Sequence, residues 1–160
     1  MKGKTCCFTG PDICKAKEFR QQYKKIKNCL REEAIKMIAQ CGVRHFICGI
    51  DRGIDTLAAE IVLAMKAVYP VTLECVISYE EQALNWSESE RNRYFSIVEH
   101  ADYETMLQTR YTFDCFQKRD HYMVNHSNYI IAVVPKNCCT IPGTVRYAQK
   151  KGIIINMISI

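Results

Sequence analysis

The sequence predicts an α/β protein with a mainly parallel central sheet between two layers of helices. Short, almost continuously apolar segments alternate with segments in which apolar residues recur every three or four positions. The first kind is typical of strands buried on both faces, and the second of amphipathic helices. Because the chain has 160 residues, the length of one domain, we expect a single domain over residues 1–160.

The first half of the chain is predicted to alternate strand and helix. Gly10-Pro11 stops the first apolar run, and Pro70 ends the second helical pattern. Gly42 follows the last apolar position of the first helical pattern, where a helix end favours a residue that tolerates positive φ. The expected elements are a strand over 5–9, a helix over 15–41, a strand over 43–48, a helix over 57–69 and a strand over 71–78.

The second half continues the alternation. Ser87 and Glu90 have the spacing of a capping box, which predicts a helix start. Pro135 ends the clearest strand of the chain, and Gly152 is placed to end the last helix. The expected elements are a helix over 87–100, a strand over 104–108, a helix over 116–126, a strand over 129–134, a helix over 144–151 and a strand over 153–158.

Ligands of such sheets bind beyond the carboxyl ends of the strands, which selects the loops 9–14, 49–55, 78–86 and 135–144. Gly49 and Gly53 precede a helix, so their loop could offer free backbone N–H groups to a phosphate. Asp55 either caps that helix or accepts a hydrogen bond from a ribose hydroxyl or a base edge.

The remaining loops each have a ligand interpretation and a structural one. Gly10 permits close approach of a ligand or simply forms a turn, and Thr144 after Pro142-Gly143 donates to a phosphate or caps a helix. Trp86, near Tyr79 and Gln82, stacks on a base or packs beneath its loop.

Several function classes are disfavoured. No apolar run is long enough to cross a membrane, and the start of the chain does not resemble an export signal, so the ten cysteines indicate the reducing cytoplasm. Cys6, Cys48 and Cys75 lie in predicted strands, as small buried apolar residues do. We predict no metal site and no catalytic residue, because neither zinc-ligand spacing nor a nucleophile–base pair is present.

The motifs of the chain resemble a known family. Thr5-Cys6-Cys7-Phe8-Thr9-Gly10 is similar to the opening strand of the bacterial YspA/YpsA-like branch of the SLOG superfamily, the Smf/DprA–LOG group. Further matches to its motifs are Gly49, Gly53, Asp55, Ala58, Ala59, Glu60, Gln82, Trp86, Arg93, Tyr94, Ala101, Asp102, the segment 119–128, Thr144, Val145, Tyr147 and Ala148. The matches extend over nearly the whole chain and keep the order of the family.

The resemblance implies a Rossmann-like three-layer α/β/α fold and a nucleotide-derived ligand that carries phosphate, such as a relative of ADP-ribose or NAD, with no certain cofactor. Three departures weaken or alter that binding: Pro11-Asp12-Ile13 replaces His-Arg-Pro, Cys139-Thr140 replaces a glycine pair, and Asn125 and Asn128 replace two aspartates. The expected ligand-binding residues are Gly10, Gly49, Asp51, Arg52, Gly53, Asp55, Tyr79, Gln82, Trp86, Arg119, Pro142, Gly143 and Thr144.

The leading hypothesis is therefore a non-catalytic or sensory nucleotide-binding domain. One alternative is cleavage of a nucleotide N-glycosidic bond, as in the LOG phosphoribohydrolases, but Tyr147 falls where their catalytic glutamate would stand, and a phenol cannot stabilise an oxocarbenium as a carboxylate does. Another is single-stranded DNA binding, as in DprA relatives, through the basic residues of 15–36. The expected partner is a small nucleotide ligand, with a second copy of the chain as a further option and no membrane.

Overall fold

The computed structural model describes residues 3–12 and 17–160. The first two residues of the helix expected over 15–41, and Ile13 and Cys14 of the first loop, lie outside this range. The described strands are β1 (Lys4–Thr9), β2 (Val43–Cys48), β3 (Thr72–Ile77), β4 (Tyr103–Met106), β5 (Tyr129–Val134) and β6 (Ile154–Ser159). The helices between them are α1 (Lys17–Cys41), α2 (Ile54–Met65), α3 (Glu88–His100), α4 (Cys115–Asn125) and α5 (Gly143–Lys151).

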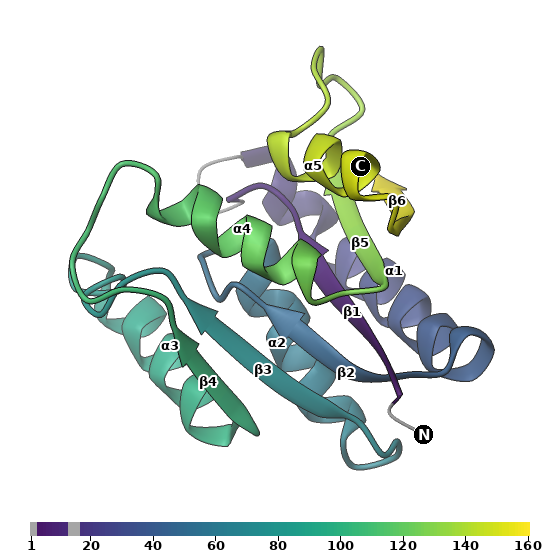
Figure 1. Cartoon of the computed structure of the whole chain (residues 1–160), viewed down its shortest axis with the longest axis horizontal. Helices are drawn as coiled ribbons and strands as arrows, with labels where there is room; N and C mark the ends of the chain where they lie inside the picture. Colours follow the sequence, from purple (N-terminus) through teal and green to yellow (C-terminus); the bar gives the residue numbers. More distant parts are fainter. Residues whose placement is uncertain (1–2, 13–16) are drawn as a thin grey trace.

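The strands form one sheet in the order β4-β3-β2-β1-β5-β6, and every neighbouring pair is parallel. The predicted α/β fold is confirmed, and the sheet is parallel throughout the described residues rather than mainly so. Helices α4 and α5 lie in front of the sheet in Figure 1, while α1, α2 and α3 lie behind it. Strand order reverses between β1 and β5, which makes their carboxyl ends the switch point of the fold.

The local signals at the helix ends are confirmed. Ser87 and Glu90 form the predicted capping box, in which each side chain accepts from the other residue's backbone N–H. Gly42 and Gly152 both have φ of 74°, a value that L side chains rarely adopt. Helix α2 ends at Met65, earlier than expected, because residues 66–69 form turns before the sheet resumes at Thr72.

Two apolar layers hold the sheet. The larger layer joins Phe8, Phe46 and Leu73 to the buried faces of α1, α2 and α3. The smaller one joins Ile47 and Ile130 to α4 and α5. Cys6, Cys48 and Cys75 are buried in the larger layer, as predicted. In the described part of the chain, no helix combines the length and the apolar character needed to span a membrane.

A polar cluster lies where β3 meets β2, β4 and α4. The Glu74 carboxylate accepts hydrogen bonds from Thr105 Oγ1 at 2.7 Å and Tyr122 OH at 2.9 Å, and it pairs with His45 Nε2 at 3.2 Å. The His45 hydrogen bond, with help from Thr105 and Tyr122 and against the effect of burial, lowers the pKa of Glu74 from 4.5 to about 2. The folded state therefore favours the ionised form of this carboxyl.

The cluster predicts an acid-sensitive contribution to stability. Because the folded pKa of Glu74 is depressed to about 2, its stabilisation is complete above the unfolded pKa of 4.5 and is lost as the pH falls toward 2. We expect Glu74→Gln to lower the free energy of unfolding near pH 7 by about 1–3 kcal/mol and to flatten its decline in acid. Urea unfolding between pH 7 and pH 2 measures the loss of stability near neutral pH and the decline in acid. Glu104→Gln, on the exposed edge strand, is the control. An unchanged acid profile would contradict the expectation.

Candidate functional site

A cavity of about 360 Å³ lies beyond the carboxyl ends of β1, β2 and β5. Its walls come from the loops after these strands, from α4 and from the start of α5. We call it the Arg119 cavity, and it is lined by Thr9, Gly10, Pro11, Asp12, Asp51, Arg52, Asp55, Arg119, Asp120, Val133, Pro135, Cys138, Pro142 and Thr144. Its position at the switch point and its volume are those of a small-molecule site.

Arg119 is a buried cation in the wall of this cavity. The residue is 6% exposed, and its Nε and Nη2 donate to Asp120 Oδ1 at 3.1 and 3.0 Å. Its Nη1 donates to no partner among the described residues, and Asp51 Oδ2 lies 3.6 Å from it, beyond hydrogen-bond range. Leaving a buried donor of a charged group without an acceptor costs free energy, so this atom is a place for a ligand acceptor.

Asp55 is the most deeply buried carboxylate of the cavity, at 6% exposure. Burial raises its pKa from 3.8 to about 7; the nearby Arg119 guanidinium opposes the increase, while Asp51 and Asp120 add to it. Asp55 therefore changes protonation close to neutral pH, unlike an ordinary aspartate.

Two of the glycines expected to admit a ligand, Gly10 and Gly49, are required by the protein's own packing. A Cβ on Gly10 would lie 2.5 to 2.7 Å from three carbons of the Ile54 side chain. A Cβ on Gly49 would lie 2.8 Å from Arg119 Nε and 3.1 Å from Asp55 Oδ2. These glycines thus let α2 approach β1 and let Arg119 cross the end of β2.

Groups of the protein itself already occupy the start of α2, where a phosphate would otherwise bind. Ile54 N donates to Pro11 O at 3.5 Å, and Thr56 N donates to Asp51 O at 3.2 Å. The Asp55 carboxyl lies in the first turn, where a negative charge interacts favourably with the positive end of the helix dipole. The N-cap is Gly53, at φ 93°, and no side chain caps the helix, so the interpretation of Asp55 as the cap is wrong.

The start of α5 is open by comparison. Its N-cap is Pro142, which supplies no side-chain cap, and a Cβ on Gly143 would meet nothing within 4 Å. Thr144 is not the N-cap: its hydroxyl donates to Asp120 Oδ2 at 2.7 Å and so joins α5 to α4. First-turn N–H groups without a cap are the usual setting for a bound anion.

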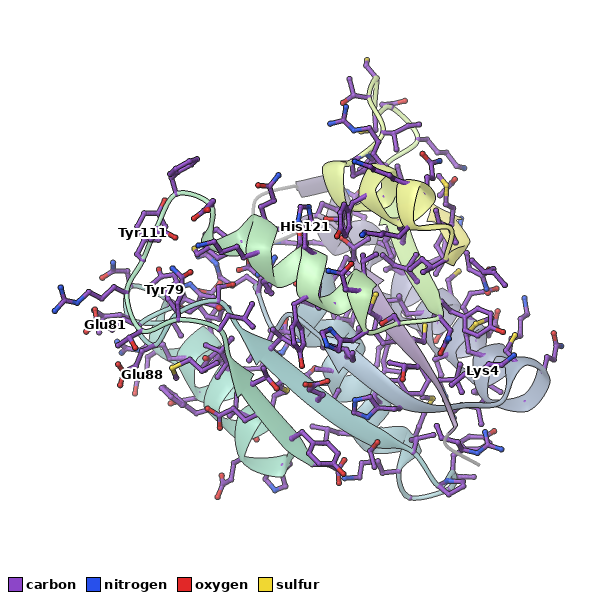
Figure 2. All side chains as sticks on the ribbon, viewed as in Figure 1. Lys4, Tyr79, Glu81, Glu88, Tyr111 and His121 are labelled. Atoms are coloured by element: carbon purple, nitrogen blue, oxygen red, sulfur yellow. The ribbon has the colours of Figure 1, made fainter. Side chains whose placement is uncertain are left out.

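The three residues singled out in the aromatic loop, Tyr79, Gln82 and Trp86, do not line the cavity. Trp86 packs edge-on against Tyr94, with ring centroids 5.4 Å apart, beneath the Arg52 guanidinium. Tyr79 packs against Tyr111 with centroids 5.4 Å apart, and Figure 2 shows the pair well away from α5. Gln82 is buried, accepts from Ser78 N at 2.9 Å and donates to Ile50 O at 3.4 Å, so it supports the loop after β2.

The cavity brings together part of the predicted site. Of the residues expected to bind ligand, those lining it are Gly10, Asp51, Arg52, Asp55, Arg119, Pro142 and Thr144. Those outside the lining are Gly49, Gly53, Tyr79, Gln82, Trp86 and Gly143. Sequence reasoning missed Asp120, which accepts from both Arg119 and Thr144. Its position directly after Arg119 in a matched segment of the family motif was the available signal.

Carboxylates outnumber cations in the cavity wall. Asp12, Asp51, Asp55 and Asp120 line it together with Arg52 and Arg119. Arg52 Nη2 lies 3.6 Å from Asp12 Oδ2, so this cation is already partly neutralised. Such a wall accepts hydrogen bonds from ligand hydroxyl and amino groups. Among the described residues, Arg119 and the α5 start are the groups that remain best placed for an anion. Among the described residues, no group of three or more His, Cys, Asp or Glu is arranged to hold a metal ion.

Sequence comparison finds relatives over most of the chain. A model of the YspA SLOG family matches residues 8–153. A Bacillus cereus protein named UPF0398 protein is 28% identical over 138 residues, which are 82% of this chain and 73% of that protein. A UPF0398 protein of Lactobacillus acidophilus is 23% identical over 110 residues, or 68% of this chain, and the match spans only 59% of that relative's length.

Comparison with solved structures finds the same fold in two DNA processing proteins. DprA from Helicobacter pylori, whose structure is described for its single-stranded DNA binding mode, has a TM-score of 0.57 at 14% identity, over 97% of this chain and 65% of that one. DprA from Streptococcus pneumoniae has a TM-score of 0.52 at 11% identity, over 96% of this chain and 58% of that one. At such identities the likeness concerns the fold alone.

Proposed function

The chain belongs to the YspA SLOG family, and from that premise and the Arg119 cavity we propose that it binds a nucleotide or nucleotide-derived ligand that carries phosphate. The observation that carries the proposal is Arg119, a buried cation in the cavity wall whose Nη1 makes no hydrogen bond with the described residues. A ligand oxygen that reaches Nη1 would give this donor the acceptor that it lacks.

We place the phosphate at the start of α5 rather than at α2. Asp55 and two backbone acceptors already occupy the first turn of α2. The first turn of α5 has no side-chain cap, Gly143 leaves its backbone open, and Pro142 and Thr144 border the same cavity as Arg119. A helix start and a guanidinium together provide N–H donors and positive charge.

The carboxylates of the cavity suit the nucleoside part of such a ligand. Asp51 is partly exposed and borders the cavity beside the more deeply buried Asp55. Ionised carboxylates only accept hydrogen bonds, so they match ribose hydroxyls and exocyclic amines. Val133 and Pro135 add apolar surface to the same wall, which a base or sugar face can cover.

Calorimetric titration with AMP tests the proposal. We expect saturable 1:1 binding that Thr144→Val weakens about tenfold, because the substitution removes a hydroxyl beside the phosphate and leaves Asp120 Oδ2 without the hydrogen bond that Thr144 donates. Thr109→Val, in the loop after β4, is the matched control and should bind as the wild type does. No heat and no thermal shift with millimolar AMP would remove the proposal.

Binding without hydrolysis is favoured over glycosidic cleavage. Tyr147, at the position where the related hydrolases carry a catalytic glutamate, donates its hydroxyl to Asn125 Oδ1 at 2.8 Å and offers no carboxylate. We therefore expect no free adenine when AMP is incubated with the purified protein and the products are separated by chromatography. Adenine release above a no-enzyme control would reverse this preference.

Single-stranded DNA is a second candidate, because α1 exposes a series of basic side chains. They are Arg20, Lys24, Lys25, Lys27 and Arg31. None of them lines the Arg119 cavity, so this surface and the nucleotide site can be tested separately. A gel shift at low salt that is lost on raising the salt concentration would support it, and no shift at low salt would exclude it.

A further inference from the structure

The two edge strands of the sheet, β4 and β6, differ in length and in charge. Strand β4 has four residues, includes Glu104 and follows Asp102, which pairs with Lys66 at 2.7 Å. Strand β6, at the opposite edge in Figure 1, has six residues, and residues 152–160 include no charged side chain and no proline. Folded proteins usually protect exposed sheet edges with short strands, charges or prolines. Strand β4 carries such protection, and β6 does not.

The outer side of β6 offers backbone hydrogen-bonding groups. Ile154 N donates to Asn128 O at 3.2 Å and Ile160 N donates to Val134 O at 3.1 Å, so these two residues face β5. In a parallel ladder, alternate residues direct their backbone groups toward the same neighbouring strand. The residues of β6 that face away from β5 are therefore Ile155, Met157 and Ser159. Within the described part of the chain, their backbone groups have no hydrogen-bond partner.

A strand added at this edge would also cover apolar side chains. Ile154 is 57% exposed and Met157 is 55% exposed. Asn156 Nδ2 lies 3.7 Å from the sulfur of Met37 on α1, and Ile155 packs in the layer that joins the sheet to α4 and α5. Because side chains alternate along a strand, Ile154 lies on the α1 side of the sheet and Met157 on the α5 side. An added strand would therefore bury apolar surface on both faces.

The charge around β6 is uniformly positive in the last part of the chain. Residues 129–160, which comprise β5, α5, β6 and their loops, include four exposed cations and no aspartate or glutamate. Lys150 and Lys151 end α5, close in the chain to the start of β6. At the other end of the strand, Lys136 N donates to Ile160 O at 2.7 Å. Cations therefore lie beside both ends of this edge.

This charge favours an acidic partner over a second copy of the chain. In a two-fold antiparallel pair of β6 strands, Lys136 of one copy would approach Lys150 and Lys151 of the other, and like charges repel. On the α1 side, Glu33 Oε2 lies 3.4 Å from Asn156 Nδ2, and its other oxygen is paired with Lys36 at 2.8 Å. An acidic segment would meet unpaired positive charge without such repulsion.

We propose that the outer edge of β6 binds an extended acidic segment of another protein as a seventh strand of the sheet. The backbone of the segment pairs with the outward groups of Ile155, Met157 and Ser159, and its carboxylates lie near the lysines at the two ends of β6. No residue of β6 lines the Arg119 cavity, so this interaction and nucleotide binding can succeed or fail independently.

Amide hydrogen exchange followed by NMR tests the edge and its occupant. In the free protein, we expect the N–H groups of Met157 and Ser159 to exchange faster than those of Asn156 and Ile158, which face β5. An octapeptide of alternating Val and Glu should bind saturably and protect Met157 and Ser159, whereas an octapeptide of alternating Val and Lys should do neither. No protection at millimolar Val–Glu peptide, or equal protection by both peptides, would overturn the proposal. Protection in the free protein that grows with protein concentration would assign the edge to a second copy and would also overturn it.

Two variants locate the binding surface. Met157→Pro removes an outward N–H and leaves the ladder to β5 intact, and Lys150→Glu/Lys151→Glu reverses the charge beside β6. Each should weaken binding of the Val–Glu peptide about tenfold. Arg110→Glu/Lys118→Glu makes the same change of charge at exposed positions before and within α4, and it should bind as the wild type does. Equal effects of the two charge reversals would count against the proposal even if Met157→Pro fails to fold.

Discussion

Gly10→Ala is expected to destabilise the folded protein by about 3 kcal/mol or more, at the upper end of the range for overpacked cores. The added methyl would lie 2.6 Å from Ile54 Cβ and 2.5 Å from its Cγ1. A Cβ has no rotamer freedom, so the clash can be relieved only by moving β1 away from α2. That movement would also separate Gly10 from Asp55, and both residues line the Arg119 cavity.

Gly143→Ala is the matched control for this substitution. No atom lies within 4 Å of the position its Cβ would take, and Gly143 is in the first turn of a helix. We expect a neutral effect or a gain of about 0.4–1 kcal/mol from the smaller entropy of the unfolded chain. Urea unfolding of both variants gives the comparison, and a Gly10→Ala protein as stable as the wild type would show that the packing at Ile54 is not tight.

Arg119→Met is expected to cost about 3–5 kcal/mol of stability, because it removes the cation that faces three carboxylates in a buried site. Asp120 loses both hydrogen bonds from the guanidinium, and Asp55 loses the largest of the effects that oppose the action of burial on its pKa. We also expect AMP binding to disappear. Lys118→Met, a neighbouring exposed cation on α4, should change stability and binding little.

The pH dependence of the Arg119→Met effect gives a further check. Burial raises the pKa of Asp55 from 3.8 to about 7, so the folded state is favoured most below pH 3.8 and loses this advantage as the pH rises through 7. Without Arg119 the pKa rises further. The variant should therefore be more strongly destabilised near pH 8 than near pH 5.5, and adding Asp55→Asn should restore part of the loss. A loss of equal size at both pH values would mean that charge pairing at Asp55 does not carry the effect.

Much of the fold could be predicted because its signals are local. The apolar run over 129–134, the capping box at Ser87 and the left-handed glycines at positions 42 and 152 each depend on a few neighbouring residues, and all are found as expected. The predicted end of α2 at residue 69 is wrong, because the helix ends at Met65. Val68 and Tyr69 continue the apolar spacing of the helix in a segment that forms turns.

The site was harder to predict because its contacts join distant segments. Gly10 and Gly49 were recognised as special, but the reason for each lies in a partner from another element, Ile54 or Arg119. Asp120 follows Arg119 in a segment that matches the family, but its role in the site depends on hydrogen bonds from Arg119 and from the distant Thr144. Trp86 follows a strand on the ligand side, yet its ring packs on Tyr94.

The amino-acid sequence by itself determined the alternation of strands and helices, the parallel sheet and the edge of the sheet where the cavity lies, because periodicity and turn residues act over a few positions. Only the tertiary structure decided which helix start is open to an anion. The carboxylate of Asp55 and the carbonyl of Pro11 occupy the start of α2, whereas the N-cap of α5 is Pro142, which supplies no side-chain cap and borders the Arg119 cavity. Whether a helix dipole is already neutralised depends on groups that folding brings from elsewhere in the chain.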